Sequence, residues 1–359
     1  MPASAAIDEA TPPAPSAAKS WRSGLGRGKQ WLADGAAYLA IRLVVAVVQT
    51  MPLDMGNYFC AILARILTHA VPVRRNVLEQ NLGLVFPAVD KTAKQQLTES
   101  MWHHLLLMVC EVAWAQRRLH RCNWSRHVTF HDNQALLRYT LSDRPAVMVT
   151  GHFGNFEIGG YLVGLMGVRS TTIARRLDNP FLDRWVQRFR SAKGQDMVDK
   201  QGCAPIIDEH LRRGGVLSLL ADQHAGPKGA WVPFCGVLAS CHKALALFAM
   251  TSGAPMLAVF TRRLGGRPMQ FESGCLGLVD PQCDPAQYSQ SVTSLTHWYN
   301  GQLEQIIDRA PEQYWWLHRR WRTPPAKIAK RLAKPAQRRR QSTCLRSDEA
   351  AQTPPVRAA

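Results

Sequence analysis

A histidine and a carboxylate stand five residues apart in "VMVTGHFGNFEIGG", residues 147–160. A neutral imidazole can remove a proton from a hydroxyl, and a neighbouring carboxylate can hold the other ring nitrogen and stabilise the imidazolium that forms. His152 and Glu157 are therefore candidates for a general base and the residue that orients it. Gly151 and Gly154 beside them would let a substrate approach the backbone closely.

The spacing itself carries no weight, because 12 histidines and 26 acidic residues in 359 positions give about one such match by chance. A second match exists at His127 and Asp132, in "HVTFHD". That segment alternates polar and apolar residues like a half-exposed strand, which would direct the two side chains to opposite faces. His152 instead follows a buried-type strand and Gly151, where α/β folds bind ligands. The alternative is structural, with the acidic residue of the first pair complementing a helix dipole.

From residue 144 onward, strand-like and helical patterns alternate. The strand-like runs are "AVMVT" (146–150), "TTIAR" (171–175), "VLSLLA" (216–221) and "PMLAVF" (255–260), and helical stretches are expected near 180–193, 203–213 and 241–252. Earlier helices are expected at 57–69 and 91–117 from apolar residues at helical spacing. Alternation of this kind predicts an α/β fold with a mixed, mostly parallel sheet flanked by helices.

The chain is strongly basic, with 44 Lys and Arg against 26 acidic residues and a formal net charge of +18. Such a balance predicts a polyanionic neighbour, either nucleic acid or an anionic membrane surface. The nine cysteines are odd in number and contain no C-x-x-C pair, which favours reduced thiols over a disulfide framework. Cys235, Cys241 and His242 lack a second pair of ligands at metal-site spacing, so we expect no metal and no cofactor.

The N-terminal region predicts a membrane anchor. Three basic residues, Arg22, Arg27 and Lys29, precede a largely apolar stretch at 35–48 that Arg42 interrupts. This length is borderline for a span, and an amphipathic core helix is the alternative. We expect four parts: a disordered tail at 1–30, an anchor helix at 31–54, a catalytic domain at 55–322 and a basic, disordered tail at 323–359.

Five blocks in order resemble the late lipid A acyltransferases, within the broader H-x-x-x-x-D/E glycerolipid acyltransferases. They are "NLGLVFP" (81–87), "GHFGNFE" (151–157), "DNPFLDRWVQRFRSAKG" (178–194), "LADQHAGPKGAWVPFCG" (220–236) and "PEQYWWLHRRWRTPP" (311–325). The resemblance covers about residues 35–322. It implies a glycerolipid-acyltransferase-like fold and transfer of an acyl chain from acyl carrier protein to a hydroxyl of a phosphorylated glucosamine lipid.

The resemblance also implies roles for particular residues. His152 would be the base and Glu157 its partner. Arg190 and Asp222, in the segments at 178–194 and 220–236, match the second and third blocks of the acyltransferase family. Arg190 could bind a phosphate or a developing oxyanion, and Asp222 could orient Arg190 or a substrate hydroxyl. Further residues are expected to bind substrate: Arg175 and Arg176 at a phosphate, with Gln223, Gly154 and Asn155.

The last block, "YWWLHRRW", interleaves aromatics with arginines. It could form an interfacial belt with cations for lipid phosphates, a stacking platform for nucleic acid, or a packed core with only the arginines in water.

The implied partners are acyl carrier protein, a phosphorylated glycolipid acceptor and membrane lipids, at the cytoplasmic face of the inner membrane. An acyltransferase for another glycolipid or lysophospholipid, with acyl-CoA as donor, stays open. A basic nucleic-acid-binding protein is a weaker alternative, because it explains neither the anchor nor the His–Glu turn and no binding motif is present. A serine hydrolase is disfavoured because no G-x-S-x-G elbow occurs.

Overall fold

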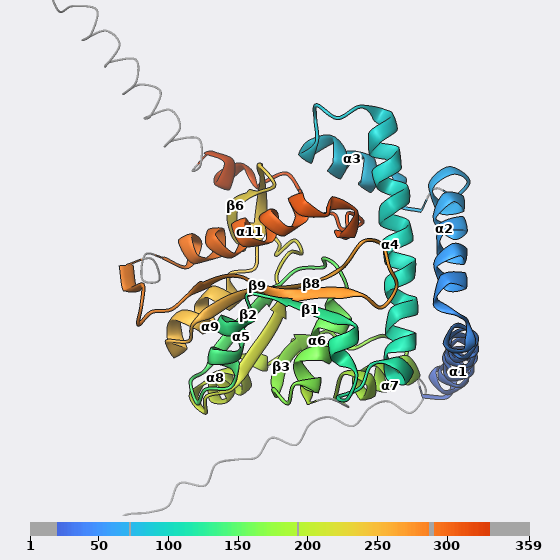
Figure 1. Cartoon of the computed structure of the whole chain (residues 1–359), viewed down its shortest axis with the longest axis horizontal. Coiled ribbons are helices and arrows are strands. Elements are labelled where there is room, and N and C mark those ends of the chain that lie inside the picture. The colour runs from blue at the N-terminus through green and yellow to red at the C-terminus, as the bar shows by residue number, and fades with distance from the viewer. Residues whose placement is uncertain (1–19, 72, 192–193, 287–290, 331–359) are drawn as a thin grey trace, which may run out of the picture.

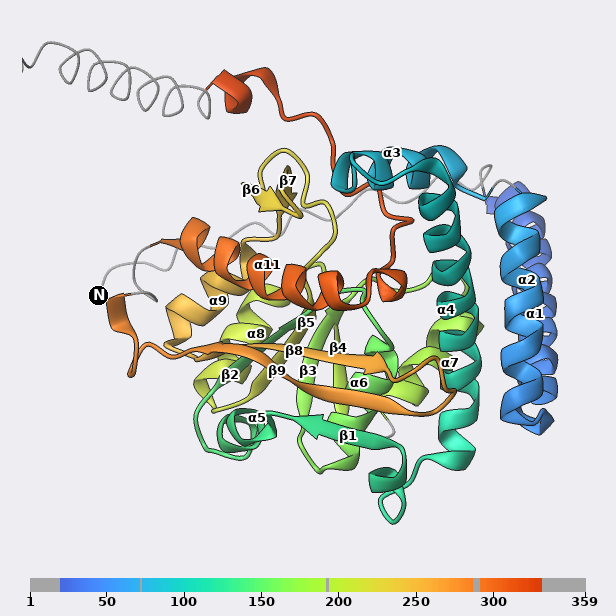
Figure 2. The same cartoon turned by 45° about the horizontal axis from the view of Figure 1, so that its top comes forward.

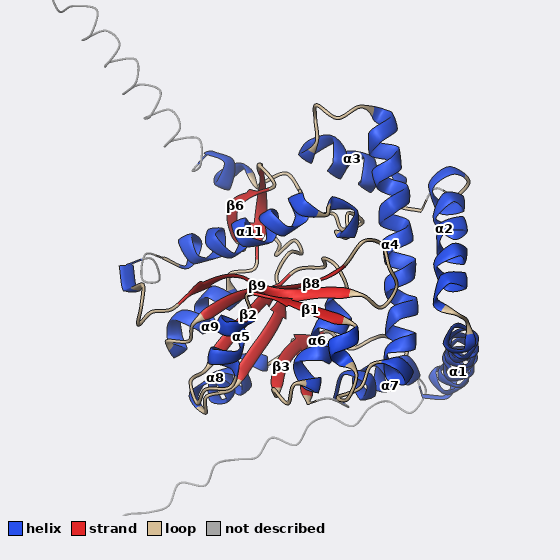
Figure 3. Ribbon diagram, in the orientation of Figure 1, coloured by secondary structure: helices blue, strands red, loops and turns tan. Residues whose placement is uncertain are grey.

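The computed structural model describes residues 20–71, 73–191, 194–286 and 291–330. A seven-stranded sheet lies at its centre, with helices on both faces (Figure 1 and Figure 3). The helices are α1 (Ser20–Thr50), α2 (Leu53–His69), α3 (Arg75–Val85), α4 (Lys91–Arg118), α5 (Asn133–Thr140), α6 (Phe156–Leu165), α7 (Pro180–Ser191), α8 (Cys203–Arg212), α9 (Ala244–Ser252) and α11 (Val292–Arg309), with 3₁₀ turns η2 (Trp124–Arg126) and η3 (Pro311–Gln313). The expected α/β class is confirmed.

The strands are β1 (Val128–His131), β2 (Ala146–Thr150), β3 (Ser170–Ala174), β4 (Gln195–Asp199), β5 (Val216–Leu220), β6 (Ala230–Phe234), β7 (Val237–Cys241), β8 (Met256–Arg263) and β9 (Phe271–Val279). The order in the main sheet is β1-β9-β8-β2-β5-β3-β4, and β6 and β7 form a separate antiparallel pair. Within the main sheet only β8 and β9 pair antiparallel. The sheet is therefore mixed and mostly parallel.

Strand β2 shows why the sheet is covered on both faces. Val147 and Val149 pack into a core with α8, α9 and α11, whereas Ala146 and Met148 pack into a second core with α5. Alternate side chains of a strand point to opposite faces, so an uninterrupted apolar run requires apolar cover on both sides. The run "AVMVT" has this cover.

The N-terminal helices lie outside α4, as two views show (Figure 1 and Figure 2). Helix α2 packs on α4, and Gly56 permits the contact, because an added Cβ would lie 2.6 Å from the Trp114 ring. Helix α1 begins at Ser20 and ends at Thr50, so residues 20–30 are helical and not a disordered tail. The expected anchor boundary at residue 54 is also wrong, since Pro52 separates the helices and caps α2.

Two further boundaries differ from expectation. The helix expected from residue 241 begins at Ala244, because β7 continues to Cys241 and pairs there with Ala230. In the C-terminal tail, residues 326–330 are helical. The rest of that basic tail, 331–359, and the first 19 residues lie outside the described residues.

Candidate active site

The register of two neighbouring strands brings His152 and Asp222 together. Strands β2 and β5 are adjacent and parallel, and Thr150 lies opposite Leu220. Two residues beyond that pair on each strand, the chain reaches His152 and Asp222. The Ala221 N–H donates to the Thr150 carbonyl (2.9 Å), which extends the pairing past the strand ends. The carboxyl edge of a parallel sheet is where α/β folds place their ligands.

Asp222 holds His152 through two hydrogen bonds. The His152 backbone N–H donates to Oδ2 at 2.9 Å, and Nδ1 lies 2.7 Å from Oδ1. The carboxylate is completely buried and the histidine side chain is 13% exposed. An ionised carboxylate only accepts hydrogen bonds, so Nδ1 carries the proton of the neutral ring and Nε2 keeps its lone pair. This tautomer is the one that a general base requires.

The charges of this pair stabilise one another. Burial lowers the pKa of His152, but Asp222 outweighs burial and raises that pKa above its ordinary 6.5. For Asp222, burial raises the pKa, but the His152 ring and backbone N–H outweigh it and hold the pKa well below its usual range. Asp222 is therefore ionised at neutral pH, and it stabilises any positive charge that develops on the imidazole.

Glu157 does not hold the His152 ring, so the structure corrects that expectation. Its carboxylate binds Arg190: Nε donates to Oε2 at 3.0 Å, and Nη2 donates to Oε1. Glu157 lies in the first turn of α6, and Arg190 comes from the last turn of α7. The carboxylate that binds His152 Nδ1 is Asp222, where Glu157 was expected. The expectation that Asp222 could orient Arg190 is also corrected, because Arg190 binds Glu157. Glu157 still contributes electrostatically, because its charge raises the pKa of His152.

Gly154 and Asn155 were expected to bind substrate, but the structure gives both of them contacts within the protein instead. Gly154 has φ +58°, and an added Cβ would lie 2.0 Å from the Thr261 carbonyl oxygen, so its missing side chain makes room for β8 and not for a substrate. Asn155 is completely buried. Its Oδ1 accepts from the Ile158 N–H and its Nδ2 donates to Glu111, so the amide caps α6 and leaves nothing for a ligand.

Arg175 and Arg176 follow β3 at the same sheet edge, but each has a carboxylate neighbour. Arg175 lies 2.9 Å from Asp178, and Arg176 lies 3.3 Å from Asp199. Both side chains are largely exposed, and neither lines the cavity described below. Their assignment to a substrate phosphate remains a prediction.

The C-terminal block closes over His152. The Trp315 N–H donates to the His152 carbonyl (3.0 Å), and the rings of Trp315 and His318 stand 5.8 and 4.8 Å from the imidazole. Gln223 Nε2 lies 3.3 Å from His152 Nε2 and 3.2 Å from His318 Nε2. An amide nitrogen only donates, so both ring nitrogens accept. His318 was not anticipated as a site residue; its place in an aromatic, arginine-rich block was the available signal.

Most of that block packs in the core. Tyr314, Trp316 and Trp321 are buried, and the packed-core interpretation holds for them. Arg320 is buried too, contrary to the expectation that the arginines are in water. Its Nη1 donates to the carbonyls of Gln223 (3.2 Å) and Ser240 (2.6 Å), which fixes the loop after β5.

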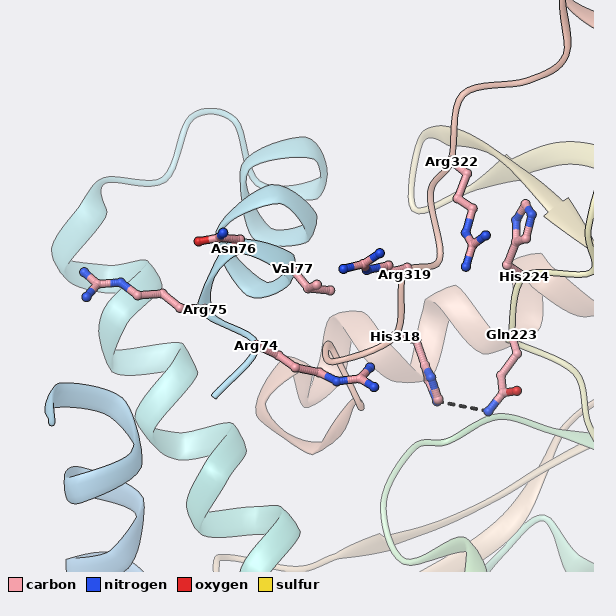
Figure 4. Close-up of a pocket in the computed structure, with 9 residues that line it drawn as sticks. All are labelled: Arg74, Arg75, Asn76, Val77, Gln223, His224, His318, Arg319 and Arg322. Carbon is pink, nitrogen blue, oxygen red and sulfur yellow. Dashed lines mark hydrogen bonds between the residues drawn. The ribbon is translucent and has the colours of Figure 1, made fainter. Parts of the chain in front are cut away.

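A cavity of about 800 Å³ opens beside this loop. It lies between the start of α3, the loop after β5 and the segment 318–322 (Figure 4). Gln223 and His318 form its wall nearest to His152. Burial lowers the pKa of His318, and the neighbouring His152 charge adds to this, which brings it to about 4. His318 is therefore neutral at pH 7.

An imidazole held by a buried carboxylate, with its lone pair beside a cavity at the sheet edge, suits removal of a proton from a hydroxyl that attacks an acyl group. The chain belongs to the bacterial lipid A biosynthesis acyltransferases, whose family model matches residues 29–323. The expected family is thereby confirmed, and the chain is an O-acyltransferase.

Curated proteins similar to this chain have names that agree with this family. The lipid A biosynthesis lauroyltransferase of Escherichia coli (strain K12) is 26% identical over 310 residues, which cover 84% of this chain and 94% of the relative. The palmitoleoyltransferase of the same organism is 27% identical over 303 residues, covering 82% and 91%. A solved 1-acyl-sn-glycerophosphate acyltransferase from Thermotoga maritima aligns with 76% of this chain and all of that chain, at 12% identity and a TM-score of 0.35, a likeness too low to support an argument.

Proposed function

We propose that this protein transfers a fatty acyl chain from an acyl thioester to a hydroxyl of a lipid A precursor. The names of the curated relatives support the acceptor class. The observation that carries the mechanism is the His152–Asp222 pair, because it leaves Nε2 unprotonated beside a cavity.

The reaction uses the imidazole twice. Nε2 of His152 takes the hydroxyl proton while the acceptor oxygen attacks the thioester carbonyl, and Asp222 stabilises the imidazolium. The tetrahedral intermediate then expels the sulfur, and Nε2 returns the proton to the leaving thiolate. The products are an ester and a free thiol, and His152 is neutral again.

Arg190 is proposed to stabilise the oxyanion or a substrate phosphate. Glu157 engages its Nε–H and one Nη2–H, and a guanidinium has five N–H donors. The remaining N–H groups of the guanidinium can donate to an anionic group of a ligand. Glu157 acts indirectly, because it fixes the orientation of the Arg190 guanidinium. Glu157 is thus proposed as a positioning residue.

The donor is proposed to be acyl carrier protein, because the family resemblance implies it and a basic protein suits an acidic carrier. Acyl-CoA is the alternative donor. We further propose that the protein binds the cytoplasmic membrane, with its catalytic domain facing the cytoplasm. Gly28–Thr50 in α1 is long and apolar enough to cross a membrane, and none of it is buried.

The function is tested by mass spectrometry of lipid A from cells with and without this protein. We expect cells that lack it to produce lipid A with one acyl chain fewer. In purified protein, His152→Ala should lower the rate of transfer from acyl carrier protein at least 10²-fold, typical of a lost general base, with the fold intact. Acyl-CoA in a parallel assay identifies the donor.

The second H-x-x-x-x-D/E match supplies the control. His127 Nδ1 contacts the Met269 carbonyl at 2.9 Å, away from the cavity, so His127→Ala should retain near-normal turnover. Unchanged lipid A, or normal turnover by His152→Ala, would contradict the proposal.

A further inference from the structure

The cavity beside His152 is lined by positive charge. Four arginines line it, Arg74, Arg75, Arg319 and Arg322, and no lining residue is acidic. Figure 4 shows Arg74 and Arg319 extending toward the space between α3 and the segment 318–322, and Arg322 extending on the other side of that segment toward Gln223, whereas Arg75 points away. Arg75 forms an exposed ion pair with Glu79 at 3.0 Å. Among the residues that the structure describes, no carboxylate is paired with the other three.

The histidines of the cavity add no charge at neutral pH. The pKa of His318 lies at about 4, and burial together with Arg322 and Arg320 lowers that of His224. The positive charge at pH 7 therefore comes from the arginines, and it does not disappear as the pH rises through the neutral range.

The first turn of α3 adds the positive end of a helix dipole. Arg75, Asn76 and Val77 line the cavity at the N-terminus of this 11-residue helix, and its N-cap, Arg74, makes no capping hydrogen bond with its side chain. A helix N-terminus carries partial positive charge and free N–H groups, which favour an anion. Arg74 has φ 52°, and its Nη1 donates to the Leu317 carbonyl at 2.9 Å, so it joins the helix to the C-terminal segment.

The cavity lies next to the base, although His152 itself does not line it. Gln223 lines it and also lies 3.3 Å from His152 Nε2, the atom proposed to take the hydroxyl proton. A molecule whose hydroxyl takes the place of the Gln223 amide at Nε2 can therefore extend its neighbouring groups into this cavity. The volume of about 800 Å³ accommodates a sugar phosphate.

We propose that this cavity binds a phosphate group of the acceptor glycolipid through Arg319, Arg322 and Arg74, together with the N-terminus of α3. The inference rests on the proposed function and adds the site that recognises the phosphorylated headgroup. The acceptor is favoured over the acyl donor, because the acceptor hydroxyl itself must touch Nε2. In an acyl carrier thioester, the neutral pantetheine arm separates the phosphate from the reacting carbonyl.

The test uses the full chain in detergent micelles and two acceptors, a phosphorylated lipid A precursor and the same lipid treated with phosphatase. Arg319→Ala, Arg322→Ala and the double variant remove exposed side chains, so the fold should be retained. We expect the double variant to raise KM for the phosphorylated acceptor at least tenfold, with kcat within about twofold, and to leave the dephosphorylated acceptor unaffected. Arg267→Ala, at an exposed arginine outside the cavity, removes one charge, as each single variant does, and should leave KM and kcat for both acceptors unchanged.

Equilibrium binding of the phosphorylated lipid, measured by calorimetry without donor, separates this proposal from the catalytic one. Loss of binding in the double variant supports the phosphate site even if no acyl transfer is found. Competition by millimolar inorganic phosphate alone, without binding of the glycolipid, would mean a free-phosphate site and overturn the proposal. Equal losses with both acceptors, or a raised KM for acyl carrier protein instead, would also overturn it.

Discussion

The residue that holds His152, the proposed base, is 70 positions away from it in the chain. Asp222 contacts both the backbone N–H and Nδ1 of His152, whereas Glu157 contacts Arg190. Both carboxylates raise the pKa of His152, and Asp222 contributes more because it is buried and hydrogen-bonded to the ring. The two carboxylates therefore have different effects that a pH profile can separate.

A base must be unprotonated, so if His152 is the base we expect activity to fall as the pH drops through the pKa of His152, which is raised above 6.5. Asp222→Asn removes the larger stabilisation of the imidazolium. We expect the acidic limb of the kcat/KM profile to move to lower pH, and the maximal rate to fall sharply.

Glu157→Gln is the matched comparison. It should move the acidic limb less far, because this carboxylate acts on His152 only at a distance. A larger shift in Glu157→Gln than in Asp222→Asn would show that Glu157 is the partner of the base after all.

At the scale of elements, a buried polar network joins α4 and β8 to the turn that carries His152. Arg263 Nε and Nη2 donate to the two oxygens of Glu111, each at 2.7 Å, and Arg263 Nη1 lies 2.9 Å from His104 Nδ1. His104 Nε2 donates to the Gly154 carbonyl at 3.1 Å. Burial, together with the Arg263 charge, holds the pKa of His104 well below 6.5, so this ring is neutral and can accept and donate at once. The network fixes the backbone at Gly154, two residues after His152.

We expect Glu111→Gln to destabilise the protein by about 3–5 kcal/mol, because it leaves the Arg263 guanidinium buried without a countercharge. The measurement is denaturant unfolding of the purified protein, followed by fluorescence. Asp208→Asn breaks the exposed pair with Arg212 and should cost less than about 1 kcal/mol. Equal stability of Glu111→Gln and the wild type would show that the network does not support the turn.

At the scale of the whole molecule, α1 is fastened to the catalytic domain at its middle and near its C-terminal end. At mid-helix, Asn179 Nδ2 donates to the Asp34 carbonyl (2.8 Å), and near the end Trp114 Nε1 donates to the Val48 carbonyl (2.6 Å). If α1 crossed the bilayer, the polar loop before α7 would lie in the hydrocarbon too, because Asn179 in that loop is hydrogen-bonded to α1. We therefore infer that α1 lies along the membrane surface, which keeps the basic N-terminal end and the catalytic domain on one side.

Leu43→Glu combined with Val47→Glu should release the protein from the membrane fraction at moderate salt. These side chains are 67% and 53% exposed, so the fold should not change, and circular dichroism checks this. Leu247→Glu on α9, 42% exposed and outside α1, introduces one such glutamate elsewhere and should leave the protein on the membrane. Full retention of the double variant would contradict surface binding through α1.

The sequence alone determined the local elements around the site. The apolar run at 146–150 predicts β2 without error, and the runs at 171–175 and 216–221 predict β3 and β5 to within one residue. These patterns depend on residues a few positions apart, since side chains alternate in strands and recur each turn in helices. The five ordered blocks also indicated the family.

Only the tertiary structure decided which side chains meet. The partner of His152 follows from the register of β2 against β5, and a pairing between strands leaves no periodic trace in either strand. The cavity could not be predicted from the sequence either, because it forms where Arg74 contacts a segment 243 residues later in the chain. Glu157 was the nearest acidic residue in sequence, but the first turn of α6 directs it to Arg190. Asp222 reaches His152 because the adjacent parallel strands β2 and β5 end at one edge of the sheet.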